Sequence, residues 1–136
     1  MREEILIKHL KNLSLENSKI KDVFIMGVDG LLIAVREQSE ENQNLAARMS
    51  GVIDLAKRIE NKLPEALSVI TTNEKIIAIP LSEDFLIIVI GTKDMDSFST
   101  LRQVGKSKNN ILSLIEKTEF SDLFSYRPVE IDGLDI

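Results

Sequence analysis

One short stretch of the sequence resembles a motif that could bind a nucleotide. Gly105-Lys106-Ser107 matches the end of a phosphate-binding P-loop. That motif also needs a glycine five residues before the Gly-Lys pair, where this chain has Thr100, and a glycine-rich loop between a strand and a helix. Here the three residues fall inside a predicted helix, where their backbone amides are already hydrogen bonded. An enzymatic interpretation has only this stretch to support it, and we expect no nucleotide site there.

Other residues that could hold a metal or act in catalysis are few and isolated. Asp94 and Asp96 begin like a calcium-binding loop, but Phe98 and the lack of a downstream glycine break the pattern. His9 is the only histidine and there is no cysteine, which argues against a zinc site or a histidine-based triad. No pair of carboxylates stands out. We therefore expect no catalytic residue, no metal and no cofactor.

Composition limits the class of protein. With 136 residues and 43% hydrophobic residues, the chain can form one domain with a substantial core. Its net charge of -5 argues against non-specific nucleic-acid binding, which requires a basic surface. The start of the chain alternates charged and apolar residues, and the longest apolar run, Phe85 to Ile90, is too short to cross a bilayer. We expect no membrane insertion and a cytoplasmic location.

The clearest predicted element is a helix from Ser39 to Leu63. Ser39 is a suitable N-cap, and Pro64 is expected to stop the helix. Apolar residues at three-and-four spacing predict a buried stripe of Leu45, Met49, Val52, Ile53, Ala56, Ile59 and Leu63. The opposite side carries Ala47, Ser50, Gly51, Asp54 and Arg58. Because several of these are small, this side is either an ordinary solvated face or a contact surface for dimerisation or another partner.

A hairpin is predicted before this helix. Two apolar runs, Val23 to Val28 and Leu31 to Val35, flank Asp29-Gly30. Asp-Gly suits a two-residue type I′ turn, in which both central residues have positive φ. Both runs are apolar on both faces, although antiparallel strands often leave one face in water. We therefore expect this hairpin to be covered on both sides.

Three further strands are predicted after the helix. Ala66 to Thr72 is rich in β-branched residues and alternates weakly, as in an edge strand. Lys75 to Leu81 contains Pro80, which belongs near a strand end or a sheet edge. Phe85 to Ile90 is apolar throughout and is expected at the centre of the sheet.

Two more helices are predicted near the ends of the chain. Arg2 to Leu15 carries a stripe of Leu6, Leu10 and Leu13. The other runs from Phe98 to Lys117, with a stripe of Phe98, Leu101, Val104, Lys108, Ile111, Leu112 and Ile115. Lys108 would have to keep its ammonium group in water.

The segment after Lys117, Thr118 to Ile136, is acidic but carries many apolar residues. It is therefore either packed against the domain, which we favour, or used to bind a partner. The predicted organisation is a domain of residues 1–117 followed by an extension of residues 118–136.

The order of these elements predicts an α+β fold. A helix, a hairpin, a second helix, a three-strand meander and a third helix give a five-stranded antiparallel sheet. Helices on both faces would explain why the strands are apolar on both sides.

At this level of detail the sequence resembles the roadblock/dynein light chain family. KIKDVFIMGVDGLLIAVR is similar to the family's first hairpin, in which two apolar strands meet at Asp-Gly. NLAARMSGVIDLAKRI takes the place of the central helix, and LPEALSVITTNEKIIAIPLSEDFLIIVIGTKD resembles the three-strand meander. The similarity extends over roughly Arg2 to Lys117.

The resemblance implies a sheet sandwiched between one central helix and two terminal helices, and a homodimer or a heterodimer with a related protein. In the family, central helices pair antiparallel and the following strands can pair across the two-fold axis. The residues implied in the dimer interface are Ala47, Ser50, Gly51, Asp54, Arg58, Leu67, Val69 and Thr71. Further candidate partner contacts are Arg48, Phe120, Leu123 and Phe124.

The resemblance also implies a function. Proteins of this family are generally non-catalytic platforms that bind small Ras-like GTPases or assemble signalling and motor complexes. An alternative is a ligand-sensing module of similar architecture, which would need a cavity with converging polar groups.

Overall fold

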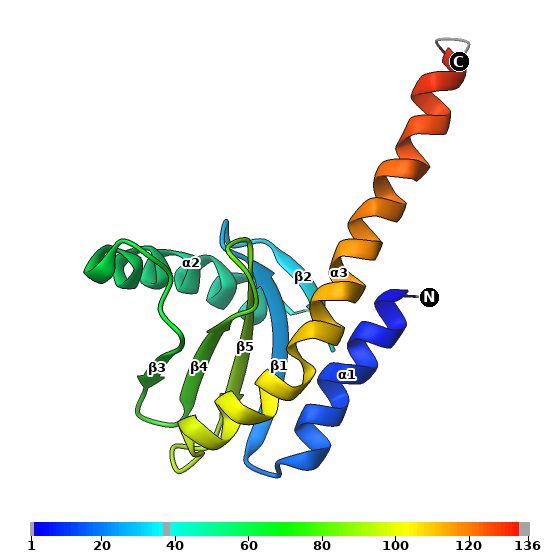
Figure 1. Cartoon of the computed structure of the whole chain (residues 1–136). Helices are drawn as coiled ribbons and strands as arrows, with labels where there is room; N and C mark the ends of the chain where they lie inside the picture. Colours follow the sequence, from blue (N-terminus) through cyan, green and yellow to red (C-terminus); the bar gives the residue numbers. More distant parts are fainter. Residues whose placement is uncertain (1, 37–38, 134–136) are drawn as a thin grey trace.

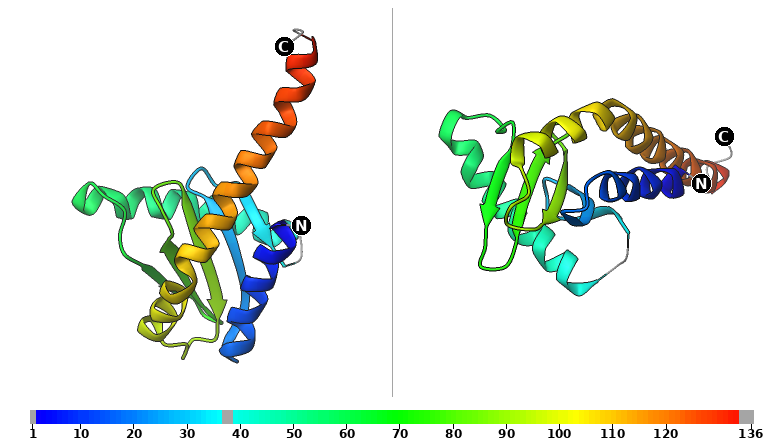
Figure 2. Two further views of the ribbon diagram at one scale, coloured as in Figure 1. Left: turned by 45° about the vertical axis from the view of Figure 1, so that its right-hand side comes forward. Right: turned by 90° about the horizontal axis from the view of Figure 1, so that it is seen from below.

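The structure is a computed structural model that describes the backbone of residues 2–36 and 39–133 and the side chains of residues 4–36 and 39–115. Its elements are α1 (Arg2–Glu16), β1 (Ile20–Gly27), β2 (Leu32–Val35), α2 (Glu40–Glu60), β3 (Leu67–Ile70), β4 (Lys75–Pro80), β5 (Phe85–Gly91) and α3 (Ser97–Gly133). The strands form one antiparallel sheet in the order β2-β1-β5-β4-β3. Helices α1 and α3 cover one face and α2 covers the other (Figures 1 and 2). The predicted fold class is confirmed.

The sheet separates two hydrophobic clusters, one on each face. The cluster on the α1 and α3 side contains Leu6, Leu10 and Leu13 of α1 together with Val104 of α3. The cluster on the α2 side contains Met49. Strand β5 lies at the centre of the sheet, and alternate residues of it enter the two clusters. This explains why the central strands are apolar on both faces, as the sequence predicted.

Helix α2 begins where the sequence predicted and ends slightly earlier. The Ser39 hydroxyl accepts a hydrogen bond from the Asn42 amide at 3.1 Å, which confirms Ser39 as the N-cap. At the other end, Asn61 adopts a left-handed conformation (φ 60°, ψ 30°) and ends the helix before Pro64. Asparagine tolerates this conformation, so the helix stops without help from the proline.

The turn of the first hairpin differs from the prediction. Among the described non-glycine residues only Asn61 has a positive φ, so Asp29 lacks the positive φ that a type I′ turn requires. Instead the Gly30 amide donates to the Gly27 carbonyl at 3.0 Å, and the Gly27 amide donates to the Leu31 carbonyl at 2.8 Å. Gly30 has a φ of +92°. This is a three-residue loop with glycine in the left-handed position.

The third helix is longer than the prediction. Its backbone continues as α3 to Gly133, beyond the expected end at Lys117, and carries the chain past the end of the sheet (Figure 1). The packing expected for Thr118 to Ile136 concerns side chains outside the described residues. The Phe98 side chain is 73% exposed rather than part of the buried stripe, because it lies in the first turn of α3 near the edge of the sheet. In the described part of the chain, none of the helices is both long and apolar enough to span a membrane.

Candidate interaction surfaces

The residues considered for nucleotide or calcium binding form a helix and local hydrogen bonds in the structure. Gly105-Lys106-Ser107 lies inside α3, as predicted, so its backbone amides belong to the helix. Lys19 pairs with Asp94 at 3.1 Å, and the Phe98 amide donates to Asp96 at 3.2 Å. A hydrogen bond from Thr92 and the nearby Lys19 lower the pKa of Asp94. Across the described residues there is no group of three or more His, Cys, Asp or Glu side chains placed to hold a metal ion.

The inward face of α2 largely follows the predicted stripe, with Ile59 as the exception. Its buried residues are Ala46, Met49 and Ile53, whereas Ile59, which was predicted to be buried, is 82% exposed. The hairpin turn also packs against the helix. The Ser50 hydroxyl donates to the Val28 carbonyl at 2.6 Å. Contact with the turn therefore draws Ser50 toward the inside of the molecule.

The five predicted contact residues of α2 consequently fall into two groups. Ser50 is half-buried against the hairpin, and the backbone of Ala47 lies close to Gly30. Gly51 is exposed, and a Cβ atom added there would meet nothing within 4 Å. Arg58 and Asp54 are exposed and form an i,i+4 ion pair at 3.1 Å. Ala47 is exposed as well, so only Ser50 of the five is partly covered.

Two large apolar side chains that the sequence analysis did not assign to this surface also lie on α2. Leu55 is 65% exposed and Ile59 is 82% exposed, one turn apart on the same helix. They lie at i+4 and i+8 from Gly51, which places all three on one side of α2. The sequence signal for this surface was the i, i+4, i+8 spacing of Gly51, Leu55 and Ile59. It was missed because Ile59 also fitted the predicted buried stripe. The exposed surface formed by these three residues is called the α2 patch below.

Strand β3 is an edge strand, as predicted. Leu67 and Val69 are half-buried and pack on the α2 side of the sheet, so their backbone is at the edge while their side chains point inward. Thr71 lies beyond the strand, where its amide donates to the Glu74 carbonyl at 2.8 Å in the turn to β4. Ile70, on the other face, is 62% exposed.

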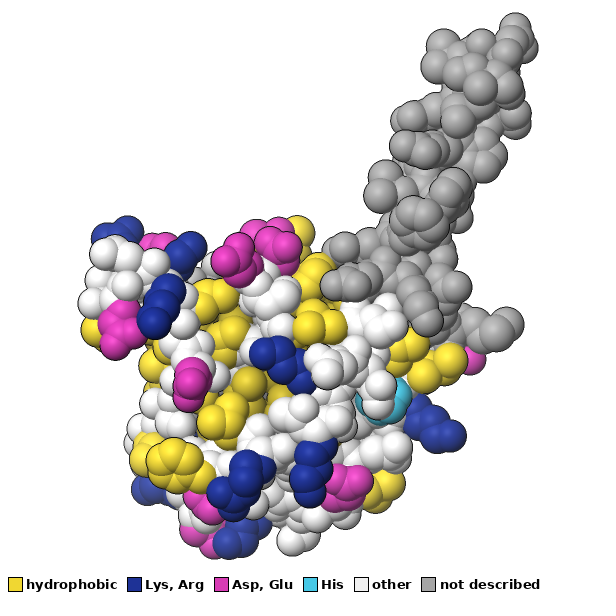
Figure 3. Space-filling view, viewed as in Figure 1, with side chains coloured by type: hydrophobic (Ala, Val, Ile, Leu, Met, Phe, Trp, Pro, Cys, Tyr) yellow, Lys and Arg dark blue, Asp and Glu magenta, His cyan; other side chains and the backbone are white. Residues whose placement is uncertain are grey.

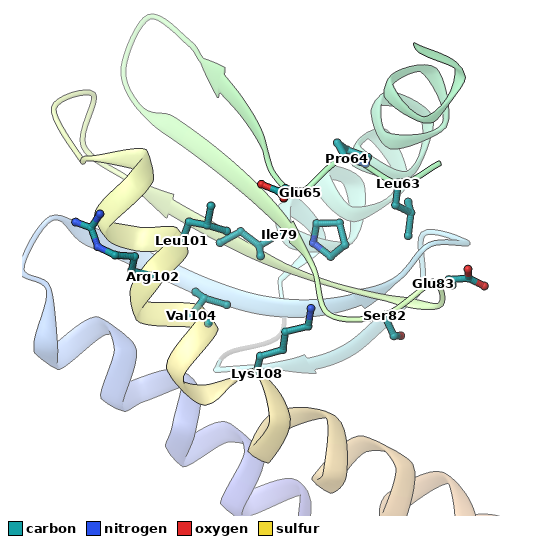
Figure 4. A pocket seen from close by; sticks show the side chains of 12 residues that line it. Leu63, Pro64, Glu65, Ile79, Ser82, Glu83, Leu101, Arg102, Val104 and Lys108 are labelled. Atoms are coloured by element: carbon teal, nitrogen blue, oxygen red, sulfur yellow. The ribbon is translucent and has the colours of Figure 1, made fainter. Parts of the chain in front are cut away.

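A groove of about 640 Å³ opens on the opposite face of the sheet, beside α3. Figure 4 shows Leu101, Val104 and Lys108 projecting from α3 on one wall, with Ile79 of β4 on the floor. The other wall comes from the segment between α2 and β3, the end of β4 and the turn between β4 and β5. Its side chains are Leu63, Pro64, Glu65, Pro80, Ser82 and Glu83. Figure 3 shows hydrophobic side chains exposed on this face, with charged side chains around them.

The groove was not foreseen, although α3 contained two signals for it. Lys108 interrupts an apolar stripe, and Gly105 is a helix-breaking residue inside a helix. Both line the groove in the structure. Of the other candidate partner contacts, Arg48 is exposed on α2, while the side chains of Phe120, Leu123 and Phe124 lie outside the described residues.

Comparison with known proteins finds similar solved structures but no matching sequence. No protein-family profile matches the chain, and no curated protein sequence matches it. Among solved structures, the Roadblock/LC7 domain from Streptomyces avermitilis has a TM-score of 0.65 at 11% identity, covering 85% of this chain and 96% of its own. MglB in a tetrameric arrangement has a TM-score of 0.73 at 11% identity, covering 86% and 92%. Myxococcus xanthus MglB has a TM-score of 0.66 at 17% identity, covering 82% and 95%.

These similarities extend over most of this chain and nearly all of each solved structure. They agree with the element order, the sheet order and the placement of one helix on one face and two on the other. At identities of 11–17% the likeness concerns the fold. The protein has the fold of the Roadblock/LC7 domain.

Proposed function

We propose that this protein is a non-catalytic dimeric adaptor that binds a small Ras-like GTPase or holds together a signalling or motor complex. The observation that carries the proposal is the α2 patch beside the free edge of β3. Leu55 and Ile59 expose most of their side chains to water in a single chain, and β3 has a hydrogen-bonded neighbour on one side only. An apolar helix face and a free strand edge both favour association.

The geometry of the patch suits a second copy of the same chain. Gly51 leaves open space at the surface of α2, so another helix backbone can approach closely there. Leu55 and Ile59 would supply apolar area, and pairing between two β3 strands would cover both free edges. MglB, which shares this fold, has been solved in a tetrameric arrangement, and this supports self-association of the fold. A related chain of the same fold could replace the second copy and give a heterodimer.

The first test is the solution mass of the full chain, measured by light scattering on a sizing column across a dilution series. We expect a dimer whose fraction falls on dilution. Gly51→Leu should shift this equilibrium toward monomer by about tenfold or more, because added volume overpacks a close contact. Gly105→Leu is the matched control, since it replaces another exposed helix glycine with open space around it, on α3. It should leave the dimer unchanged.

A chain that stays monomeric at every concentration would contradict the homodimer. A dimer that Gly51→Leu does not weaken would remove the α2 patch as the interface. Either result is separate from partner binding, which needs its own experiment.

The second test is binding to small Ras-like GTPases from the same genome, each loaded with GDP or with a GTP analogue. We expect co-elution of one GTPase with the dimer and no nucleotide hydrolysis by the adaptor alone. Arg48 is exposed on α2, so Arg48→Ala tests whether this arginine contacts the bound GTPase. If the dimer forms and no GTPase binds in either state, the GTPase part of the proposal is wrong and the scaffold part is the one to pursue.

A further inference from the structure

The groove beside α3 is an unfilled part of a helical layer. Two helices, α1 and α3, cover this face of the sheet, and α3 crosses it obliquely (Figure 1). The start of α3 lies near β3, where Ser97 and Ser68 are hydrogen bonded at 3.0 Å. Farther along, the helix moves away from this edge and leaves a groove in which half-buried Leu101 lines the wall, above the buried side chains of Ile79 and Val104. A helix is about 10 Å across, so one more helix beside α3 would continue the existing layer.

The two walls of this groove carry opposite charges. Arg102 and Lys108 line the α3 wall, and Glu65 and Glu83 line the other. None of the four forms an ion pair with another residue whose side chain the structure describes. Residues Ser97 to Ile115 of α3 contain three Lys and Arg residues and no Asp or Glu, although the chain as a whole is acidic. The charges at the groove are therefore available to a partner.

Gly105 leaves α3 without a side chain at one position that lines the groove. It lies inside the helix, where glycine costs about 1 kcal/mol relative to alanine. A Cβ atom added there would meet nothing within 4 Å, so no packing within the described chain requires glycine at this position. A bare backbone does, however, allow another backbone to approach closely. Close approach of a partner would explain a glycine at this position, whereas packing within the single chain does not.

We propose that the groove binds an amphipathic helix of a partner protein. The helix places an apolar stripe against half-buried Leu63 and Leu101, carboxylates on the side facing Lys108, and cations on the side facing Glu65 and Glu83. Charge complementarity with the two walls fixes its orientation, and Gly105 sets the closest point of approach. The site lies within one chain, and its α3 wall is on the face of the sheet opposite α2.

The test uses two synthetic helical peptides of about 14 residues, or four turns, and the full-length protein. Both peptides carry the same leucine stripe at helical spacing. The first has glutamate on one flank and lysine on the other, and the second has lysine on both flanks. Fluorescence polarisation of the labelled peptides measures binding. We expect the first peptide to bind wild-type protein about tenfold more tightly than the second, since truncating or mismatching charge pairs at an interface has effects of this order.

Two variants test the groove itself. In Arg102→Glu/Lys108→Glu both walls are acidic, so the preference should reverse in favour of the peptide with two lysine flanks. Gly105→Leu fills the closest point of approach and should weaken both peptides about tenfold or more. The protein should stay folded in each case, which circular dichroism would verify, because all three positions face open space or the groove.

Gly51→Leu is the control on the opposite face and should leave peptide binding unchanged. The proposal is overturned if neither peptide binds wild-type protein, if both bind equally, or if Gly105→Leu binds as wild type does. A loss of dimer in Gly51→Leu with unchanged peptide binding would separate this site from the proposed dimer interface.

Discussion

Glycine at position 30 suits both the backbone conformation of the hairpin turn and the close packing of the turn against α2. Its φ of +92° lies in a region that residues with a side chain rarely adopt. A Cβ atom there would also lie 3.3 Å from the Ala47 Cα and 3.4 Å from the Ser50 Cβ. The Asp29 carboxylate accepts a hydrogen bond from the Leu31 amide at 3.1 Å and holds the turn. One glycine thus allows both the turn and its contact with α2.

We predict that Gly30→Val lowers the free energy of unfolding by about 1–3 kcal/mol, the usual cost of forcing a side chain into this conformation. Urea denaturation followed by circular dichroism measures the change. The control is Gly51→Ala, where the glycine lies in a helix and has open space around it. It should raise stability by up to about 1 kcal/mol. Equal stability of Gly30→Val and wild type would show that the turn does not need glycine.

Which residues of α2 are buried depends on the elements that pack against it. Spacing alone predicted the helix and its capping residue, and the structure confirms both. The hairpin turn packs against the helix, since the Val28 carbonyl accepts a bond from Ser50 and Gly30 lies against Ala47. Ile59, which the sequence had placed in the core, is exposed in the last turn of the helix. The exposed α2 patch is therefore a product of packing between elements.

The cap of α2 gives a prediction for the whole element. Ser39→Ala should destabilise the protein by about 1 kcal/mol, because the Asn42 amide loses its side-chain acceptor. Ser39→Asp keeps an acceptor and places a negative charge at the helix N-terminus, so it should be close to wild type. Thermal unfolding at fixed protein concentration measures both. If Ser39→Asp loses as much stability as Ser39→Ala, the effect is not due to capping.

At the scale of the whole molecule, protection should decrease from the centre of the sheet outward. Strand β5 has hydrogen-bonded neighbours on both sides and hydrophobic clusters on both faces. Strands β2 and β3 are the edges. The amides of a central buried strand exchange only when a large part of the molecule opens, whereas edges open locally.

Hydrogen exchange measured by mass spectrometry should therefore be slowest in β5 and faster in β2 and β3. The two edges should also respond differently to protein concentration. If copies pair through β3, its exchange slows as the dimer forms, while β2 exchange stays the same. Slowing at both edges, or at neither, would contradict pairing through β3. Comparison with Gly51→Leu at the same concentrations separates dimerisation from general stabilisation.

Three features could be predicted from the sequence alone: the order of the elements, the fold class and the edge position of β3. These follow from local spacing, caps and turn residues, and each depends on neighbours along the chain. It also located Gly105-Lys106-Ser107 inside a helix. It misjudged the hairpin turn, because Asp-Gly fits both a two-residue and a three-residue loop, and the choice depends on how the strands align.

Which surfaces remain open depends on how the elements pack in three dimensions. The α2 patch lies where Leu55 and Ile59 stay exposed, and the groove lies where α3 crosses the sheet at an angle and leaves space between Leu101 and the segment after α2. Both depend on residues far apart in the sequence, and an apolar residue in a helical stripe has the same pattern whether another element covers it or not. The sequence thus indicates which residues favour burial. The packing of the elements decides which of these residues remain exposed and can contact a partner.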